Sequence, residues 1–427
     1  MMLALMIGSV ILLMLLGMPV AIALLLVTIV VFVVDGVPLA TFVQMAARGV
    51  DAYTLLALPF FILTAKLMNA SGATDRLLQL GLVTVGWLRG GLAHANVMAS
   101  FLFAGVSGSA VADAAGLGAV EMRAMQRAGY SKRFALGVTA ASSTVGPIIP
   151  PSVVMIVYGI ASGTSIGALF IAGIVPGVLM AIVLMLVTGV LALRERTVER
   201  TPFRAKALPA AFLAALPGLL TPVIVVGGIL TGAFTATESG AVAALYAFVI
   251  SLVGQSRLGA RQIWNLLRET IVESGGILLI MAAAAAFSWV LAFNQGPQIA
   301  LSWLTGVSES AVIILILLAI VFLLMGCFIE AIAIITMTVP VLMPVLAAYG
   351  IDPLHFGVVL ALLMSIGTIT PPLGIVMFTL CRITNTGVGE FVSAIWIWLC
   401  ALVGVTLILV LWPGLVLWLP REMGLWR

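Results

Sequence analysis

Long apolar runs recur along the chain and limit its fold more strictly than any other feature. A run of about 20 apolar residues can cross a bilayer as an α-helix. The strands of a membrane barrel would be shorter and would alternate apolar with polar residues. The sequence therefore predicts an all-α polytopic membrane protein in contact with the lipid bilayer. The runs lie at 2–34, 54–70, 91–107, 109–127, 133–163, 166–193, 209–232, 237–254, 270–293, 311–327, 330–349, 354–381 and 392–419.

Composition excludes most other classes of protein. Only 8% of the 427 residues are charged, whereas a soluble domain carries about 25%. So few charges cannot cover a water-facing surface, which excludes a cytosolic enzyme, a secreted domain and a nucleic-acid binder. The net charge of +4 carries information on topology and implies no acidic partner. The sequence contains no metal or organic-cofactor motif such as CxxC or HExxH.

Basic residues predict the orientation of the spans. They cluster at 123–133, 194–206 and 257–268, and 269–381 contains neither Lys nor Arg. Basic loops usually face the cytoplasm, so 91–127 would begin and end on the cytoplasmic side and 311–349 outside. We interpret both segments as re-entrant helical hairpins.

Three short stretches leave alternatives open. Segments 194–208 and 256–269 mix charged with apolar residues and could be amphipathic surface helices or solvated loops. The run at 2–34 is interrupted by Gly17-Met18-Pro19, so it could form one long tilted span or two short ones.

The chain contains an internal repeat with a shift of 221 residues. Segment 105–152 matches 326–373 without a gap, with 12 identities in 48 positions. Gly146 aligns with Gly367 and Pro150-Pro151 with Pro371-Pro372. The first copy is followed by basic residues and the second is not, which indicates opposite orientations and thus an inverted-topology repeat, typical of secondary transporters. The alternative is a coincidence of Gly and Pro in two helix breaks.

The paired prolines predict that each repeat contains a broken helix. Pro removes a backbone donor and clashes with the preceding turn, and carbonyl groups left unpaired at membrane depth are costly. Hydroxyl and carbonyl oxygens are ligands that a hard cation such as Na⁺ prefers, and helix N-termini would suit an anionic substrate. The alternative role of these small polar residues is helix–helix packing. The candidates are the turn 106–109 with Ser142, Ser143, Thr144 and Gly146, and the turn 326–330 with Ser365, Gly367, Thr368 and Thr370.

Acidic residues inside the apolar runs are the second anomaly, because a charge in a span is costly and usually functional. They are Asp113, Glu121, Glu238, Glu273 and Glu330. Asp113 and Glu330 are predicted either to accept backbone N–H bonds at the hairpin turns or to bind a cation or proton. Glu121 is expected to pair with Arg123 or Lys132, Glu238 to cap a helix and Glu273 to act in a gate or in packing.

Four long motifs resemble one known family. They are SGSAVADAAGLGAVEM, GYSKRFALGVTAASSTVGPIIPPSVVMIVYG, TATESGAVAALYA and GTITPPLGIVMF. These are similar to the large membrane subunit (the DctM-type permease) of TRAP, or tripartite ATP-independent periplasmic, transporters, and the similarity covers essentially the whole chain. The resemblance implies Na⁺-driven import of an organic acid such as a dicarboxylate or sialic acid across the cytoplasmic (inner) membrane of a bacterium or archaeon.

The same resemblance implies partners and a site. The partners would be a periplasmic substrate-binding protein and a small membrane subunit of about four spans, each of roughly 20 apolar residues. Na⁺ would be the coupling ion, with no organic cofactor. The implied Na⁺ ligands are Ser107, Ser109, Ser142, Ser143, Gly146 and Pro147 in the first repeat, and Gly326, Glu330, Gly367, Thr368 and Thr370 in the second. Our candidates for substrate contact are Ser109, Asp113, Thr144 and Ser365.

The expected mechanism is an elevator movement of a transport domain against a scaffold. The predicted division is 1–90 (scaffold), 91–165 (first hairpin and broken helix), 166–293 (scaffold and surface arms), 294–385 (second hairpin and broken helix) and 386–427 (C-terminal span). The alternatives are a stand-alone Na⁺/divalent-anion symporter that needs no binding protein, an intramembrane enzyme and a membrane scaffold. An enzyme is disfavoured because no His or Lys base accompanies Ser109 or Ser142.

Overall fold

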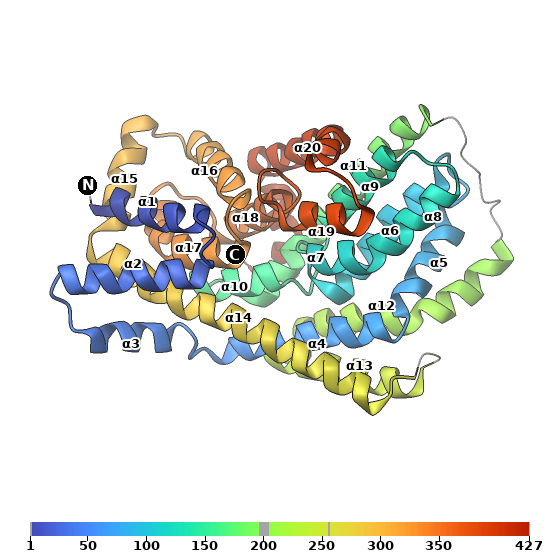
Figure 1. Cartoon of the computed structure of the whole chain (residues 1–427), viewed down its shortest axis with the longest axis horizontal. Coiled ribbons are helices and arrows are strands. Elements are labelled where there is room, and N and C mark those ends of the chain that lie inside the picture. Colours follow the sequence, from blue (N-terminus) through green and yellow to red (C-terminus); the bar gives the residue numbers. More distant parts are fainter. Residues whose placement is uncertain (1, 196–204, 255–256, 427) are drawn as a thin grey trace.

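The computed structural model describes residues 2–195, 205–254 and 257–426, and within these ranges it contains helices and no strands. In the described part of the chain, seven helices are long and apolar enough to cross a membrane, or eight if one bent pair is a single span. The all-α polytopic fold predicted from the apolar runs is therefore confirmed. Figure 1 shows the elongated arrangement, with the N-terminal helices at one end and α5, α6 and α8 near the other.

The first half of the chain ends before the linker at 196–204, which lies outside the described residues. Its helices are α1 (Met2–Leu15), α2 (Val20–Val34), α3 (Leu39–Arg48), the 3₁₀ turn η1 (Tyr53–Leu56), α4 (Ala57–Ala70), α5 (Ala73–Val85), α6 (Gly91–Ser107), α7 (Ala110–Asp113), the π-helical segment η2 (Ala114–Gly118), α8 (Ala119–Arg127), α9 (Lys132–Ser143), α10 (Val153–Ser162) and α11 (Ile166–Ala192).

The second half contains the 3₁₀ turn η3 (Ala205–Ala207), α12 (Leu208–Leu230), α13 (Ala236–Val253), α14 (Ala260–Phe293), α15 (Gly296–Val307), α16 (Ala311–Gly326), α17 (Ala331–Ala348), α18 (Pro353–Gly367), α19 (Ile375–Thr384), α20 (Val388–Leu411) and α21 (Gly414–Glu422). The long helix α14 runs diagonally between the outer helices and the centre (Figure 1) and packs against α2, α3, α4 and α17.

The two halves repeat each other helix by helix with the shift of 221 residues. Adding 221 to the segment Ala110–Arg127 gives 331–348, the bounds of α17. In the same way α6 corresponds to α16, α9 to α18, α10 to α19 and α11 to α20. Each break carries a cis X-Pro bond, at Pro150-Pro151 and at Pro371-Pro372.

The contacts between the repeats are reciprocal. Helix α10 packs against α17, and its counterpart α19 packs against α7 and η2, the counterparts of α17. The Ser365 hydroxyl donates to the backbone carbonyl of Thr144 at 2.6 Å, and these two residues are exactly one repeat shift apart. Residues that meet their own counterparts lie on an axis of two-fold symmetry, as the repeat with opposite orientations requires.

Several element boundaries differ from the sequence predictions. The run at 2–34 forms two helices because Gly17 adopts a positive φ and Pro19 starts α2. The run at 392–419 is divided between α20 and α21 at Trp412-Pro413. Residues 260–269 are the start of the 34-residue α14, so they form neither a separate surface helix nor a loop.

Three helices were not predicted: α3, α5 and α15. Each is 10 to 13 residues long, which is too short for an apolar run to stand out. Helix α5 also carries Asp75, Arg76 and Gln79. The bend between α15 and α16 is 117°, so the second hairpin is preceded by a separate short helix.

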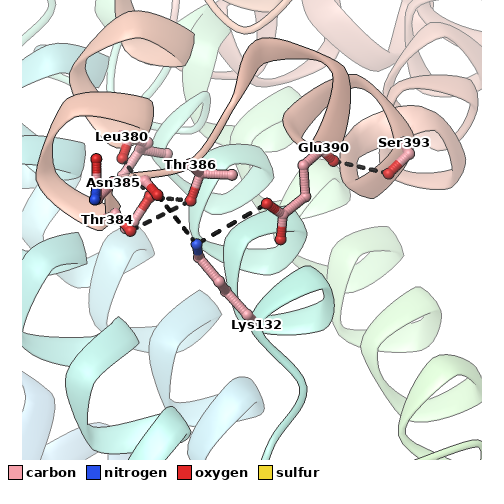
Figure 2. Close-up of polar contacts among 7 residues, drawn as sticks. All are labelled: Lys132, Leu380, Thr384, Asn385, Thr386, Glu390 and Ser393. Carbon is pink, nitrogen blue, oxygen red and sulfur yellow. Dashed lines mark hydrogen bonds and ion pairs between the residues drawn. The ribbon is translucent and has the colours of Figure 1, made fainter.

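The start of α9 is tied to α19 and α20. The Lys132 ammonium lies 3.9 Å from the Glu390 carboxylate and donates to the carbonyl of Asn385 at 3.4 Å (Figure 2). The Arg133 guanidinium donates to the carbonyl of Ser393 at 2.6 Å. The predicted pairing of Lys132 with Glu121 is therefore wrong, because Lys132 turns outward to the end of α19 instead.

Candidate functional site

A cavity of about 680 Å³ lies where the two hairpin turns meet α4 and α14. The first hairpin contributes 107–112 and the second contributes Gly326 with 328–332. The broken helices add Pro147, Val153 and Val154 from one repeat, and Met364, Thr368, Leu373 and Ile375 from the other. Both repeats thus build one shared cavity.

Helix ends converge on this cavity. The N-terminal residues of α7, α10, α17 and α19 all line it, and so do the C-terminal residues of α6 and α16. Helix N-termini carry partial positive charge and C-termini partial negative charge. One cavity therefore offers N–H groups that suit a carboxylate and carbonyl groups that suit a cation.

Each hairpin turn is pressed against the broken helix of its own repeat. A Cβ on Gly146 would lie 3.1 Å from the backbone of Ser109, and one on Gly367 would lie 2.6 Å from the backbone of Gly326. Gly108 has a φ of +59° and faces the carbonyl of Pro151. The backbone N–H of Leu373 donates to the carbonyl of Cys327 at 3.1 Å. Glycine is needed at these contacts because the two backbones touch.

Charged side chains line the wall of the cavity that α4 and α14 provide. The Lys66 ammonium lies 3.3 Å from the Glu269 carboxylate and 3.0 Å from that of Glu273. Glu330, the N-cap residue of α17, also lines the cavity and makes no side-chain capping bond. Lys66 therefore links α4 to α14 and places the one ammonium group among the lining residues.

Six of the predicted site residues line the cavity: Ser107, Ser109, Pro147, Gly326, Glu330 and Thr368. The Ser107 hydroxyl is buried and has no hydrogen-bond partner among the described residues. The Ser109 hydroxyl accepts from the backbone N–H of Ala112 at 3.4 Å and so caps α7. The structure thus brings together residues that lie more than 200 positions apart in the sequence.

The other predicted site residues do not line the cavity. The hydroxyls of Ser143, Thr144 and Thr370 donate to carbonyls in their own segments at 2.6 to 2.8 Å. Ser142 bonds to α6, and Ser365 bonds to Thr144. The predicted residues that do not line it are Asp113, Ser142, Ser143, Thr144, Gly146, Ser365, Gly367 and Thr370.

The sequence matches the family described as tripartite ATP-independent periplasmic transporter, DctM component, over residues 7–415. The chain belongs to this family. It is 38% identical over 413 residues to the sialic acid TRAP transporter large permease protein SiaM of Vibrio cholerae, with 95% of each chain covered. It is also 38% identical over 375 residues to the C4-dicarboxylate TRAP transporter large permease protein DctM of Pseudomonas aeruginosa, covering 88% of each.

A solved structure shows the same fold. The Alcanivorax borkumensis YdaH transporter superposes with a TM-score of 0.59 and 19% identity, over 88% of this chain and 87% of that one. Membership of the DctM family and the candidate spans make this TRAP large permease a multi-pass protein of the inner membrane and not an enzyme. The predictions on localisation and on enzyme activity are thus confirmed.

The structure bears on the predictions made for four of the acidic residues of this permease. Glu238 and Glu273, which lie inside apolar runs, are exposed. Glu238 forms a capping box with Thr235, which confirms its predicted role as a cap. The carboxylate oxygens of Glu121 and Asp113 have no hydrogen-bond partner among the described residues. Glu121 thus pairs with neither Arg123 nor Lys132, and Asp113 accepts no backbone N–H bond.

Sequence reasoning missed the charged wall of the cavity. Lys66, Asn69 and Glu269 line it but were not among the candidates. One signal was present, because Lys66 is the single charge inside the apolar run 54–70. Nothing in the local sequence shows that Glu269 and Glu273, one turn apart on α14, face that lysine.

Proposed function

We propose that this TRAP large permease imports an organic acid together with Na⁺, and that a periplasmic binding protein and a small membrane subunit are its partners. The observation that carries the proposal is the convergence of four helix N-termini and two C-termini on one cavity. Relatives named for sialic acid and for C4-dicarboxylates support a carboxylate as the transported group. The substrate carboxylate would meet the N-termini of α7, α10, α17 and α19.

We infer one Na⁺ site in each repeat. The first would use Ser107, Ser109 and Pro147 at the cavity surface, with Ser142, Ser143 and Gly146 behind them. The second would use Gly326, Glu330 and Thr368, with Gly367 and Thr370 behind. A cation bound between a hairpin turn and a broken helix would draw the two segments together and so shape the substrate site between the repeats.

The transport step would then be an elevator movement. The segments 91–165 and 294–385 would travel together, because their reciprocal contacts join them, while 1–90 and 166–293 would form the scaffold. Filling the sites with cation and substrate would satisfy the exposed backbone oxygens, so the loaded domain could cross where an empty polar site could not. Coupling of Na⁺ transport to substrate transport requires that each ligand bind one conformational state of the permease more tightly than the other state.

Uptake into proteoliposomes tests the proposal. The permease would be reconstituted with its small membrane subunit and its binding protein, and uptake of labelled organic acids measured with an inward Na⁺ gradient or a matched K⁺ gradient. We expect uptake only with Na⁺ and only with the binding protein. Uptake that ignores Na⁺ would reject the symport mechanism, and uptake without the binding protein would favour a stand-alone symporter.

A pair of serine variants tests the inferred site. Ser107→Ala removes an unpartnered hydroxyl that lines the cavity and should raise the Na⁺ concentration needed for half-maximal uptake. Ser251→Ala removes a hydroxyl that bonds within α13, to the carbonyl of Phe248, and should leave this concentration unchanged. Equal behaviour of the two variants would exclude Ser107 as a ligand.

A further inference from the structure

The side chains that line the cavity carry more negative than positive charge. Of the described residues that line it, Lys66 is the one base, and Glu269, Glu273 and Glu330 are the acids. Three carboxylates repel an organic acid that enters the cavity, so the attraction has to come from the helix N-termini and from Lys66. The placement and the bonding of Lys66 are therefore central to the entry of an anion.

Helix geometry holds Lys66 on the cavity face of α4. The residues of α4 that line the cavity follow one another at steps of three and four, which is the spacing of a single helix face. The carboxylates of Glu269 and Glu273 come from one face of α14 in the same way, because these residues are four positions apart. The lining residues of α4 are Ile62, Ala65, Lys66, Asn69 and Ala70.

Asn69 adds a second donor group on α4, three residues after Lys66. Its side-chain carbonyl accepts from the Thr74 hydroxyl at 2.8 Å, which leaves the N–H groups of the amide for other partners. The amide nitrogen lies 3.2 Å from the place that a Cβ on Gly116 would take, so it faces the first hairpin. The cavity face of α4 thus presents an ammonium and an amide, two donors that suit a carboxylate.

The ion pairs of Lys66 can be exchanged at little cost. The Lys66 side chain is 24% exposed, whereas those of Glu269 and Glu273 are 60% and 52% exposed. The two glutamates therefore stay hydrated when they lose the lysine, and exposed ion pairs contribute little to stability. The ammonium carries three donors on a flexible four-carbon stem. It can thus turn from a glutamate to another carboxylate nearby.

We propose that Lys66, with Asn69 beside it, is an exchangeable anion contact that binds a second acidic group of the substrate. This contact rests on the proposed function, in which a first carboxylate meets the helix N-termini. Without substrate, Glu269 and Glu273 hold Lys66. They compete with the substrate for the ammonium, and this competition keeps substrate binding weak enough for release.

The contact would also differ between the two states of an elevator. Lys66 belongs to the scaffold segment 1–90, whereas the N-termini of α7, α10, α17 and α19 belong to the segments that would travel. A substrate that reaches both must leave Lys66 when these segments move. Lys66 then contributes to binding in one state only, and a ligand shifts a conformational equilibrium only through such a difference.

Binding of small acids to the purified full-length permease in Na⁺ tests the contact without transport. The probes are succinate and glutarate, each compared with its half-amide, which has the same length and one carboxylate fewer. We expect the wild type to bind a diacid about tenfold more tightly than its half-amide, the effect of one charge-assisted hydrogen bond. Lys66→Met should lose this preference and keep the wild-type affinity for the half-amide.

Two further variants separate an anion contact from a structural tie. Lys132→Met is the matched control, because Lys132 also makes a partly exposed ion pair, with Glu390, but does not line the cavity. It should keep the preference for the diacid. Glu273→Gln removes a competitor for Lys66 and should tighten diacid binding. If Glu273→Gln instead weakens diacid binding as Lys66→Met does, the three residues only join α4 to α14 and the proposal is overturned.

The wild type keeps the test decisive even if a variant fails to fold. Equal affinity for diacid and half-amide overturns the proposal, and so does the failure of both diacids to bind. Failure of the proposed function would look different. Uptake that ignores Na⁺ would reject the symport mechanism but leave the preference for the diacid over the half-amide unchanged.

Discussion

The two repeats share an arrangement of helices but differ in the side chains that fill their interiors. This difference separates the features that the fold requires from those that it does not require. Both repeats have a hairpin turn pressed on a broken helix, glycine at that contact and a cis X-Pro bond at the break. Among the described residues, only the first carries the buried hydrogen-bond chain that links Ser100, Ser142, Asn96 and Thr139, together with the buried acids Asp113 and Glu121. The shared features shape the cavity, and the unshared ones make the interior of the first repeat polar.

Substitution of the glycines between hairpin turn and broken helix should have the largest effect on uptake. The size of this effect should differ between the two repeats. In Gly367→Ala the new Cβ would lie 2.6 Å from the backbone of Gly326, so turn and broken helix must separate. Overpacking of this kind costs about 1–3 kcal/mol, and we expect Na⁺-dependent uptake to be lost. In Gly146→Ala the nearest backbone atom is 3.1 Å away, so a small shift suffices and uptake should fall but remain measurable.

Proteoliposome uptake and the thermal unfolding midpoint would check both glycine variants. Gly404→Ala is the control, because nothing lies within 4 Å of a Cβ at that position. A Gly146→Ala variant more damaged than Gly367→Ala would contradict the comparison of the two contacts.

The hydrogen bond between repeat counterparts should give an intermediate effect. Ser365→Ala removes the donor that reaches the carbonyl of Thr144 at 2.6 Å, and both residues are buried. A buried carbonyl without its donor costs about 1–3 kcal/mol, so the unfolding midpoint should fall. Thr144→Ser keeps both the carbonyl and a hydroxyl and should leave the midpoint close to that of the wild type. A midpoint unchanged by Ser365→Ala would mean that this bond contributes nothing to joining the repeats.

Substitutions at the starts of α9 and α18, which correspond to each other in the two repeats, should have the smallest effects on stability. They should sharpen the comparison of the repeats. Asp352 caps α18 by accepting from the N–H of Leu354 at 2.8 Å, and it also accepts from the Trp426 indole at 2.9 Å. Loss of a cap costs about 0.5–2 kcal/mol, so Asp352→Ala should lower the unfolding midpoint. Lys132→Ala removes a 3.9 Å ion pair that is partly exposed and worth about 0–1 kcal/mol. The thermal unfolding midpoint of Asp352→Ala should be lower than that of Lys132→Ala. The opposite order would refute this account of the two helix starts.

Much of the backbone could be predicted because its causes are local. The hairpin helices at 91–107 and 330–349 lie within two residues of α6 and α17, since an apolar run bounded by turn residues specifies a helix without reference to its neighbours. The two breaks follow from adjacent prolines near a glycine, because Pro removes a backbone donor and clashes with the preceding turn. A single proline such as Pro340 or Pro344 stays inside its helix. The long helix α14 was predicted only in part, because packing against α4 and α17 extends it through residues that mix charged with apolar side chains.

The site was harder to predict because side-chain environment depends on distant segments. Glu238, Glu273 and Glu121 all lie in apolar runs, yet the first two are exposed and the third is buried. Local sequence does not distinguish these cases, because each depends on which helix packs against that face. Lys66 was overlooked for the same reason, since its partners come from α14, about 200 positions later.

The sequence by itself determined that this protein is a helical membrane protein with a repeated hairpin and a repeated broken helix, because apolar length, glycine and proline act on the chain within a few residues. Tertiary structure alone decided that the two repeats share one cavity, that Lys66 and Glu330 face it and that Asp113 and Glu121 are sealed away from it. These outcomes depend on which helix faces pack together, and packing joins residues that no local pattern connects.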